Sequence, residues 1–149
     1  MADWSEWEET LLAAMIADAT FAAMLADGAE SFLQQGQPDN GRYPLAVWTT
    51  VRRGSCPLDL SGGKYRPQIS ISFFADSPYV ARDVAEYASQ KFRIPSADFS
   101  NQLTSTNWRI DSLICEDMMN GGVVRDLNDG SKIYEVVTDW QALVVQIPA

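Results

Sequence analysis

The sequence predicts an α+β fold, in which helices pack on one face of a mainly antiparallel four-stranded sheet. Apolar residues recur at helical spacing near the amino terminus, polar and apolar residues alternate over residues 65–74, and an amphipathic helix follows that alternation after a Ser-Pro pair. The predicted order of elements is α(α)-β-β-α-β-β, within one domain that covers residues 1–149.

The first helix is predicted to begin at Ser5-Glu6-Trp7-Glu8, a capping box in which the Ser5 hydroxyl accepts from the backbone N–H of Glu8. Asp18 falls within the apolar stripe that follows, where an unpaired carboxylate is destabilising. We therefore expect a break at Asp18, which would cap a second short helix from Ala19 to Leu25. The stripe itself consists of Trp7, Leu11, Leu12, Met15 and Ala19.

Two strands are predicted in the middle of the chain. Leu45–Arg52 is rich in β-branched and aromatic residues, and Tyr65–Phe74 alternates with a period of two. The segments 34–43 and 54–63 contain Gly, Pro and Asn-Gly, and they are predicted to be loops. The second strand would have one face in the core and one face in water.

The helix after this strand is predicted to begin at Pro78, with Ser77 as its N-cap. Ser77 is interpreted as a structural cap, because it lacks a GxSxG setting and a histidine to activate it. Ile94-Pro95 would end the helix. Its expected buried stripe is Val80, Val84, Tyr87, Ala88 and Phe92.

The carboxyl-terminal part is predicted to hold two more strands. After a polar loop over 96–107, the third strand is expected from Trp108 to Cys115. The Gly121-Gly122 pair and the turn Asn128-Asp129-Gly130 would then lead into a long fourth strand, from Lys132 to about Gln146.

Composition and charge narrow the class of protein. A chain of 149 residues with 46% hydrophobic residues can bury a globular core, and no apolar stretch is long enough to span a membrane. The start lacks the basic region of a signal peptide, so synthesis in the cytoplasm is expected. Residues 1–41 contain eight acids and no Lys or Arg, and such an end repels nucleic acid and anionic lipid.

The residue types needed for common catalytic sites are scarce. The chain has no histidine, which removes Ser-His and Cys-His nucleophile pairs and the usual zinc sites. Cys56 and Cys115 are far apart without a CxxC motif, so two reduced cysteines are favoured over a disulfide. We expect no catalytic, cofactor-binding or metal residues, no cofactor and no enzymatic activity.

Three short motifs resemble ligand sites and are better explained as turns or solvated surface. Ser61-Gly62-Gly63-Lys64 lacks the spacing of a phosphate loop and precedes a strand. Residues Asp126–Gly130 resemble the start of a calcium loop, but the glycine is one position early and Val137 stands at the twelfth position. Glu116-Asp117 could share a magnesium ion with Asp126, although acids beside a turn are more often simply exposed.

Several segments, in this order, resemble a known family. They are Pro44–Trp48, Ile71–Asp76 running into the helix Tyr79–Glu86, and Arg125–Tyr134 followed by Asp139-Trp140. Together with the amphipathic first helix they resemble the tail-completion (tail-terminator) proteins of long-tailed bacteriophages. The resemblance covers roughly residues 8–146.

The resemblance implies a single tail-terminator-like domain over residues 1–149 and a structural protein of the virion tail or neck, made in the cytoplasm of the host bacterium. It implies a homo-oligomer, a hexameric ring that caps the tail tube protein and joins it to the head connector or neck protein. DNA would pass through the ring without sequence-specific binding, and no membrane would be a partner.

Two alternatives stay open. One is another neck component, such as a head-completion or connector subunit. The other is a ferredoxin-like small-molecule-binding regulator, which would need a concave apolar pocket with converging polar groups. A carboxylate-dependent metal hydrolase is a third and more remote option.

A ring subunit should leave strand edges and apolar area for its neighbours to cover. Trp48, Trp108 or Trp140, if exposed on the strands, would supply such area. The strand from Lys132 to Gln146 exceeds the usual length of three to ten residues. We expect its far half to reach beyond its own sheet and to contact the next subunit.

Overall fold

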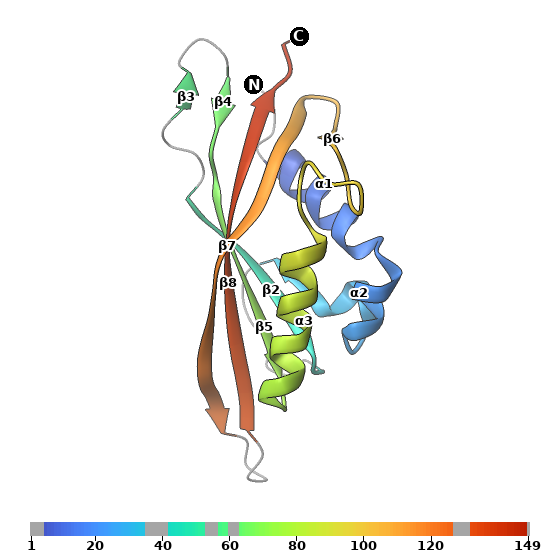
Figure 1. The fold of residues 1–149 in the computed structure, drawn as a ribbon, viewed down its shortest axis with the longest axis vertical. Coiled ribbons are helices and arrows are strands. Elements are labelled where there is room, and N and C mark those ends of the chain that lie inside the picture. Colours follow the sequence, from blue (N-terminus) through green and yellow to red (C-terminus); the bar gives the residue numbers. More distant parts are fainter. Residues whose placement is uncertain (1–4, 35–41, 53–56, 60–62, 127–131, 149) are drawn as a thin grey trace.

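The computed structural model describes residues 5–34, 42–52, 57–59, 63–126 and 132–148 (Figure 1). None of the helices within these ranges is long and apolar enough to cross a membrane. The helices are α1 (Ser5–Ile16), α2 (Ala19–Met24), the 3-10 helix η1 (Gly28–Ser31) and α3 (Pro78–Lys91). The strands are β1 (Phe32–Gln34), β2 (Leu45–Arg52), β3 (Pro57–Asp59), β4 (Lys64–Tyr65), β5 (Gln68–Ala75), β6 (Leu103–Thr104), β7 (Trp108–Asp126) and β8 (Lys132–Gln146).

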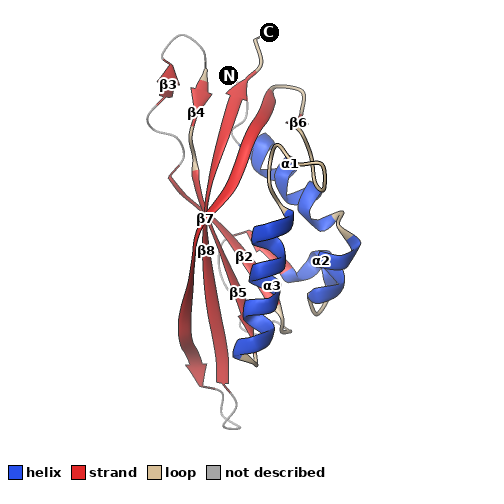
Figure 2. Ribbon diagram, in the orientation of Figure 1, coloured by secondary structure: helices blue, strands red, loops and turns tan. Residues whose placement is uncertain are grey.

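The fold has two layers, a curled sheet and a layer of helices on one side of it (Figure 2). The predicted α+β class with a four-stranded antiparallel sheet is wrong, because the described residues form a mixed α/β structure with an eight-stranded sheet. Strand β1 runs parallel to β2, and the other pairings are antiparallel. The short strands escaped prediction because two or three residues are too few to show a period.

Strand β8 is the centre of the sheet. It pairs with β7 along its whole length, and on its other side it pairs first with β5 and then with β4. Arg66 and Pro67 separate β4 from β5, because Pro67 has no N–H to donate to a ladder. The expected single strand Tyr65–Phe74 is therefore two strands, and the expected loop 54–63 contains β3.

Strand β7 is much longer than expected. It was predicted to end at Cys115 and it continues to Asp126, through the Gly121-Gly122 pair that we interpreted as a turn. The register shifts between Asn120 and Gly122, and Gly122 has φ = +73°, a conformation that favours glycine. The pair therefore forms a β-bulge, and the bounds of β8 match the prediction.

The break between the first two helices is confirmed. Asp18 is the N-cap of α2, and its carboxylate accepts from the backbone N–H of Phe21 at 2.9 Å. The same carboxylate accepts from the Tyr87 hydroxyl of α3 at 3.0 Å. Helix α1 spans Ser5–Ile16, and the Glu8 carboxylate, the partner of Ser5 in the predicted capping box, accepts from the Thr50 hydroxyl at 2.6 Å.

Helix α3 begins at Pro78 after Ser77, as predicted, but the Ser77 side chain makes no capping hydrogen bond. The expected buried stripe is only partly correct, since Val80 is exposed and Tyr87 is half-buried. Ala81 and Ala85 are buried in their place, because small residues let the helix lie close to the sheet. The side chains of Tyr79 and Val80 are thereby left exposed to solvent.

The main core lies between the helices and the sheet. Trp7 and Trp48 pack with ring centroids 6.5 Å apart, and Phe21 contacts Phe92 edge to face at 5.0 Å. A smaller cluster of Leu45, Val47, Phe74 and Ile133 lies on the opposite face of the sheet. Near Ile133, at the start of β8, the sheet is therefore packed against apolar residues on both of its faces.

Candidate assembly surface

The outer edge of β7 is free over most of its length. Strand β6 covers it at Arg109 and Ile110, and Ile94 forms an isolated bridge with Leu113. Beyond Leu113, no described strand pairs with this edge, which we call the free edge of β7 (Ile114–Asp126). A free edge presents unpaired N–H and C=O groups to which another strand can add.

Exposed apolar side chains gather along this edge. Among the described residues, the large apolar side chains that are exposed lie on β7 and on the first turn of α3. They are Tyr79 (69%), Met119 (53%), Val123 (46%), Ile114 (42%) and Val80 (38%). We call these five the apolar rim, and their concentration on one part of the surface is typical of an interaction site.

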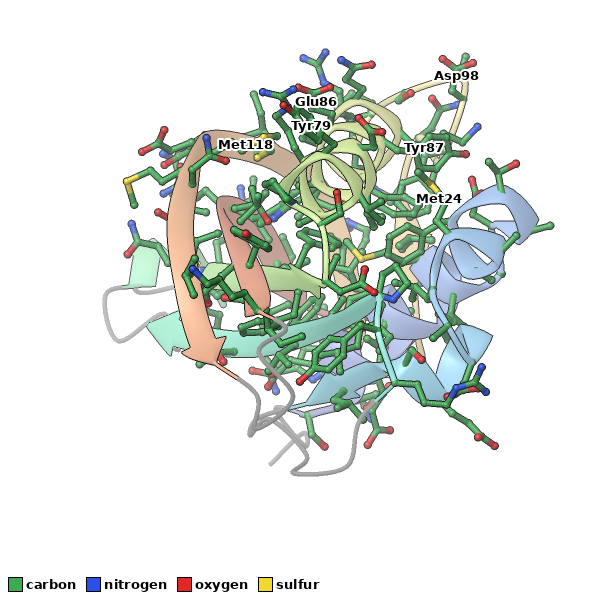
Figure 3. The ribbon with its side chains drawn as sticks, turned by 90° about the horizontal axis from the view of Figure 1, so that it is seen from below. Met24, Tyr79, Glu86, Tyr87, Asp98 and Met118 are labelled. Carbon is green, nitrogen blue, oxygen red and sulfur yellow. The ribbon has the colours of Figure 1, made fainter. Side chains whose placement is uncertain are left out.

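The apolar rim occupies both faces of the sheet beside the free edge. Met119 lies opposite Val137, which alternates with the buried Val136 and Thr138 and so faces away from the helices. Tyr79 lies on the helix side, where Figure 3 shows it on the outward side of α3, with Met118 on the neighbouring part of β7. A strand added to this edge would therefore meet apolar groups on each of its faces.

Two surface grooves run between α3 and β7. The first has a volume of about 330 Å³ and the second about 430 Å³. The first is lined by Pro78, Tyr79, Arg82, Asn120, Gly122, Tyr134, Glu135 and Val136. The second is lined by Ser89, Gln90, Arg93, Ile114, Cys115, Glu116, Asp117 and Met118.

The middle of the free edge is acidic. Asp117 lies opposite Asp139 of β8, and Glu116 sits in the bulge between Cys115 and Asp117. The Asp117 carboxylate accepts from the backbone N–H of Met118 at 2.9 Å. Like charges directly opposite each other in a sheet are destabilising, so this part of the edge favours a positively charged partner.

The Cys115 thiol beside these acids is unsuited to nucleophilic chemistry. Burial raises the pKa of the Cys115 thiol, and the negative charges of Asp139, Asp117 and Glu116 raise it further. A raised pKa keeps the thiol protonated, and the thiolate is the reactive form. Cys115 is free, in agreement with the predicted reduced state, whereas Cys56 lies outside the described residues.

The structure does not bring together the residues of the possible magnesium site that the sequence suggested. Asp126 lies at the far end of β7 opposite Lys132, ten strand positions away from Glu116. No group of three potential metal ligands occurs in the described part of the chain. Gly63 directly precedes β4 and Lys64 is its first residue, while residues 61–62 and 127–131 of the two loop motifs lie outside the described ranges.

Two expectations about the assembly surface were wrong. Trp48, Trp108 and Trp140 are all buried, so the tryptophans leave no apolar area uncovered. The far half of β8 also stays inside its own sheet, since β7 and β4 pair with it up to Gln146 and Val145. The uncovered edge belongs to β7, and its sequence signal was the Val-Val pair that follows Gly121-Gly122.

No family model matches the chain, and no curated protein matches it. Among solved structures, the chain is similar to one described as "Virion of native gene transfer agent (GTA) particle". The identity is 14% and the TM-score is 0.65, over 95% of this chain and 96% of the other. At this identity the likeness shows the fold alone.

A second solved chain, which carries no descriptive name, aligns with 13% identity over 97% of this chain and 94% of its own length. Its TM-score of 0.46 is too low to carry an argument. The finding that stands is a shared fold, along nearly the whole of both chains, with a protein of a virion particle.

Proposed function

We propose that the chain is a structural protein of a virion, in which it forms the tail-terminator ring at the head-proximal end of the tail tube. The observation that carries the proposal is the shared fold with a chain of a gene transfer agent virion over 95% of this chain. The segments that resemble tail-terminator proteins, Pro44–Trp48 and Ile71–Glu86 among them, support the position in the tail.

The surface of the subunit supports assembly. The free edge of β7 and the apolar rim are features that a lone domain leaves open and that other components of an assembly cover. A closed ring of six copies would give every subunit the same neighbours on each side. The grooves beside α3 are surface features flanking an edge strand, which favours protein contacts over a small-molecule regulator.

The charge of the chain suits a channel for DNA. The net charge is −9 at pH 7. Carboxylates repel the phosphate backbone, so a ring of such subunits would let DNA pass without binding it. A neck component next to the terminator is the second candidate, because the similar structure is described as a whole virion.

Electron cryomicroscopy of the assembled particle tests the proposal. We expect density for this chain in a ring between the tail tube and the head connector. Particles that lack the chain should show unjoined heads and tails of irregular length, and the intact chain supplied in trans should restore them. Density elsewhere in the neck would favour the second candidate, and density outside the particle would contradict both.

A further inference from the structure

We propose that the free edge of β7 binds an extended, basic segment of a different protein, which adds to the sheet as a strand beside Ile114–Val123. This inference deepens the proposed function and rests on it only for the identity of the partner as another virion component. The binding chemistry itself follows from the backbone, the side chains and the charges along this edge.

The backbone of β7 restricts where a strand can add. Register shifts fall between Cys115 and Asp117, between Asn120 and Gly122, and between Val123 and Arg125. Bulges of this kind prevent indiscriminate pairing of sheet edges. They leave a regular stretch from Asp117 to Asn120, so a partner strand would align its central residues with this stretch.

The side chains around that stretch select an alternating partner. On one face of the sheet Met119 is exposed, and on the other face Tyr79 of α3 borders the groove of about 330 Å³. Successive residues of a strand point to opposite faces. A partner with apolar residues at alternate positions would cover Met119, and an aromatic or long aliphatic side chain between them would reach the groove beside Tyr79.

The charges select a basic partner. Glu116 and Asp117 lie at the centre of the edge, and Asp139 lies beside them on β8. These three acids outnumber the two nearby bases, which are Arg93, just after the end of α3, and Arg66, which lies beside Ile114. Arg82, the next base along the groove, lies 3.9 Å from Glu86. Lys or Arg residues on an added strand would be attracted to this region and would steer the approach of the partner.

The same charges disfavour a second copy of this chain. The other long edges of the sheet are β1, within the first 41 residues with their eight acids and no base, and β3, whose sequence Pro-Leu-Asp has an acid and no base. If either strand of a copy added to β7, it would bring no base to Glu116 and Asp117, and Glu30 just before β1 or Asp59 in β3 would add negative charge there. A copy would therefore be repelled where a basic strand from another protein is attracted.

Peptide binding to the full chain tests the inference. The probes are two short peptides that alternate valine with a charged residue around one tryptophan, the first with lysine and the second with glutamate. We expect the lysine peptide to shift the amide resonances of Ile114–Val123 and Tyr79 in NMR spectra. The glutamate peptide should leave these resonances unchanged. Added salt should weaken the binding of the lysine peptide, because it screens the attraction between the charges.

Charge reversals separate the edge from general attraction. The double variant Glu116→Lys, Asp117→Lys should bind the lysine peptide roughly tenfold more weakly or worse, because both attractive charges become repulsive. Glu30→Lys, Asp98→Lys makes the same change in net charge at exposed positions away from β7, and its affinity should stay within about twofold of the parent.

Three results would overturn the inference. They are equal binding of both peptides, an equal loss in the control variant, or self-association of the free protein that protects the Ile114–Val123 amides from hydrogen exchange. A ring seen in the particle with this edge covered by a copy would also overturn it, while the proposed function would stand. If the lysine peptide binds at the edge but the chain lies elsewhere than in the tail-terminator ring, the inference would stand and the proposed function would be contradicted.

Discussion

Asp117 of β7 lies directly opposite Asp139 of β8, on the sheet face that the helices leave uncovered. On its other side Asp139 pairs with Ser70 of β5, which carries no positive charge. Two carboxylates held side by side in this way lower the stability of the isolated chain. A partner that brings a positive charge would remove this repulsion.

Replacing Asp139 by Asn should therefore stabilise the chain. Removing one of two opposed like charges is expected to raise the free energy of unfolding by about 0.2–1 kcal/mol at low salt, and the gain should shrink at high salt. Urea denaturation of the two proteins measures the difference. Asp98→Asn, at an exposed position with no opposed acid, is the control, and a loss of stability in Asp139→Asn alone would contradict the prediction.

Replacing Asp18 by Ala should destabilise the chain. The Asp18 carboxylate accepts from the Phe21 N–H and from the Tyr87 hydroxyl, so Ala removes the cap of α2 and its tie to α3. We expect a loss of about 0.5–2 kcal/mol in chemical denaturation, the typical value for an N-cap. Asp18→Asn keeps a capping oxygen and should lose less, whereas a stabilised Asp18→Ala would mean that the cap has no importance.

Replacing Glu6 by Gln should change how stability depends on pH. Hydrogen bonds from the side-chain amide and the backbone N–H of Asn107 hold the pKa of the Glu6 carboxyl below its ordinary value. A carboxyl with a lowered pKa in the folded state contributes stability at neutral pH, and this contribution is lost as the pH falls through that lowered pKa.

Thermal melting of both proteins from pH 7 to about pH 3 tests this expectation. Glu6→Gln should melt below the parent at neutral pH, and the two midpoints should converge in acid. Glu9→Gln, an exposed substitution in the same helix, should run parallel to the parent at every pH. Midpoints for Glu6→Gln that stay a constant distance from the parent would contradict the role of Glu6.

Replacing Thr138 by Val should reveal a buried polar contact in the centre of the sheet. The Thr138 hydroxyl donates to the Ile71 carbonyl at 2.8 Å and accepts from the Trp140 indole at 2.7 Å. Val leaves both groups without this partner, and the expected loss is about 1–3 kcal/mol in urea denaturation. Thr49→Val, on an exposed position of β2, should cost little, and equal losses would contradict the assignment.

Local signals in the sequence predicted the helices and the central strand well. Asp18 interrupts an apolar stripe, and Pro78 after Ser77 marks a helix start, because caps depend on neighbouring residues alone. The stripe of α3 was less predictable. Whether Val80 or Ala81 is buried depends on how closely the helix approaches the sheet, and that distance is set by tertiary packing.

The assembly surface was largely invisible in the sequence. A Gly-Gly pair is typical of a turn. Gly121-Gly122 is instead a bulge inside a strand, because the residues on both sides of the pair are paired with β8. The opposition of Asp117 and Asp139 likewise depends on the register between β7 and β8, which shifts at four places. Resemblance to tail-terminator proteins indicated assembly, but the resemblance could not show which edge is free.

The arrangement of β8 bears on how the subunit would respond to tension. Strand β8 is bonded to β7 along its whole length, and β5 and β4 follow one another on its other side. Antiparallel hydrogen bonds stand perpendicular to the strands. A pull along the strand direction would load all of these bonds together in shear, whereas a pull across the free edge of β7 would peel its single ladder one bond at a time. The subunit should therefore be mechanically stiff along the strands and compliant across them.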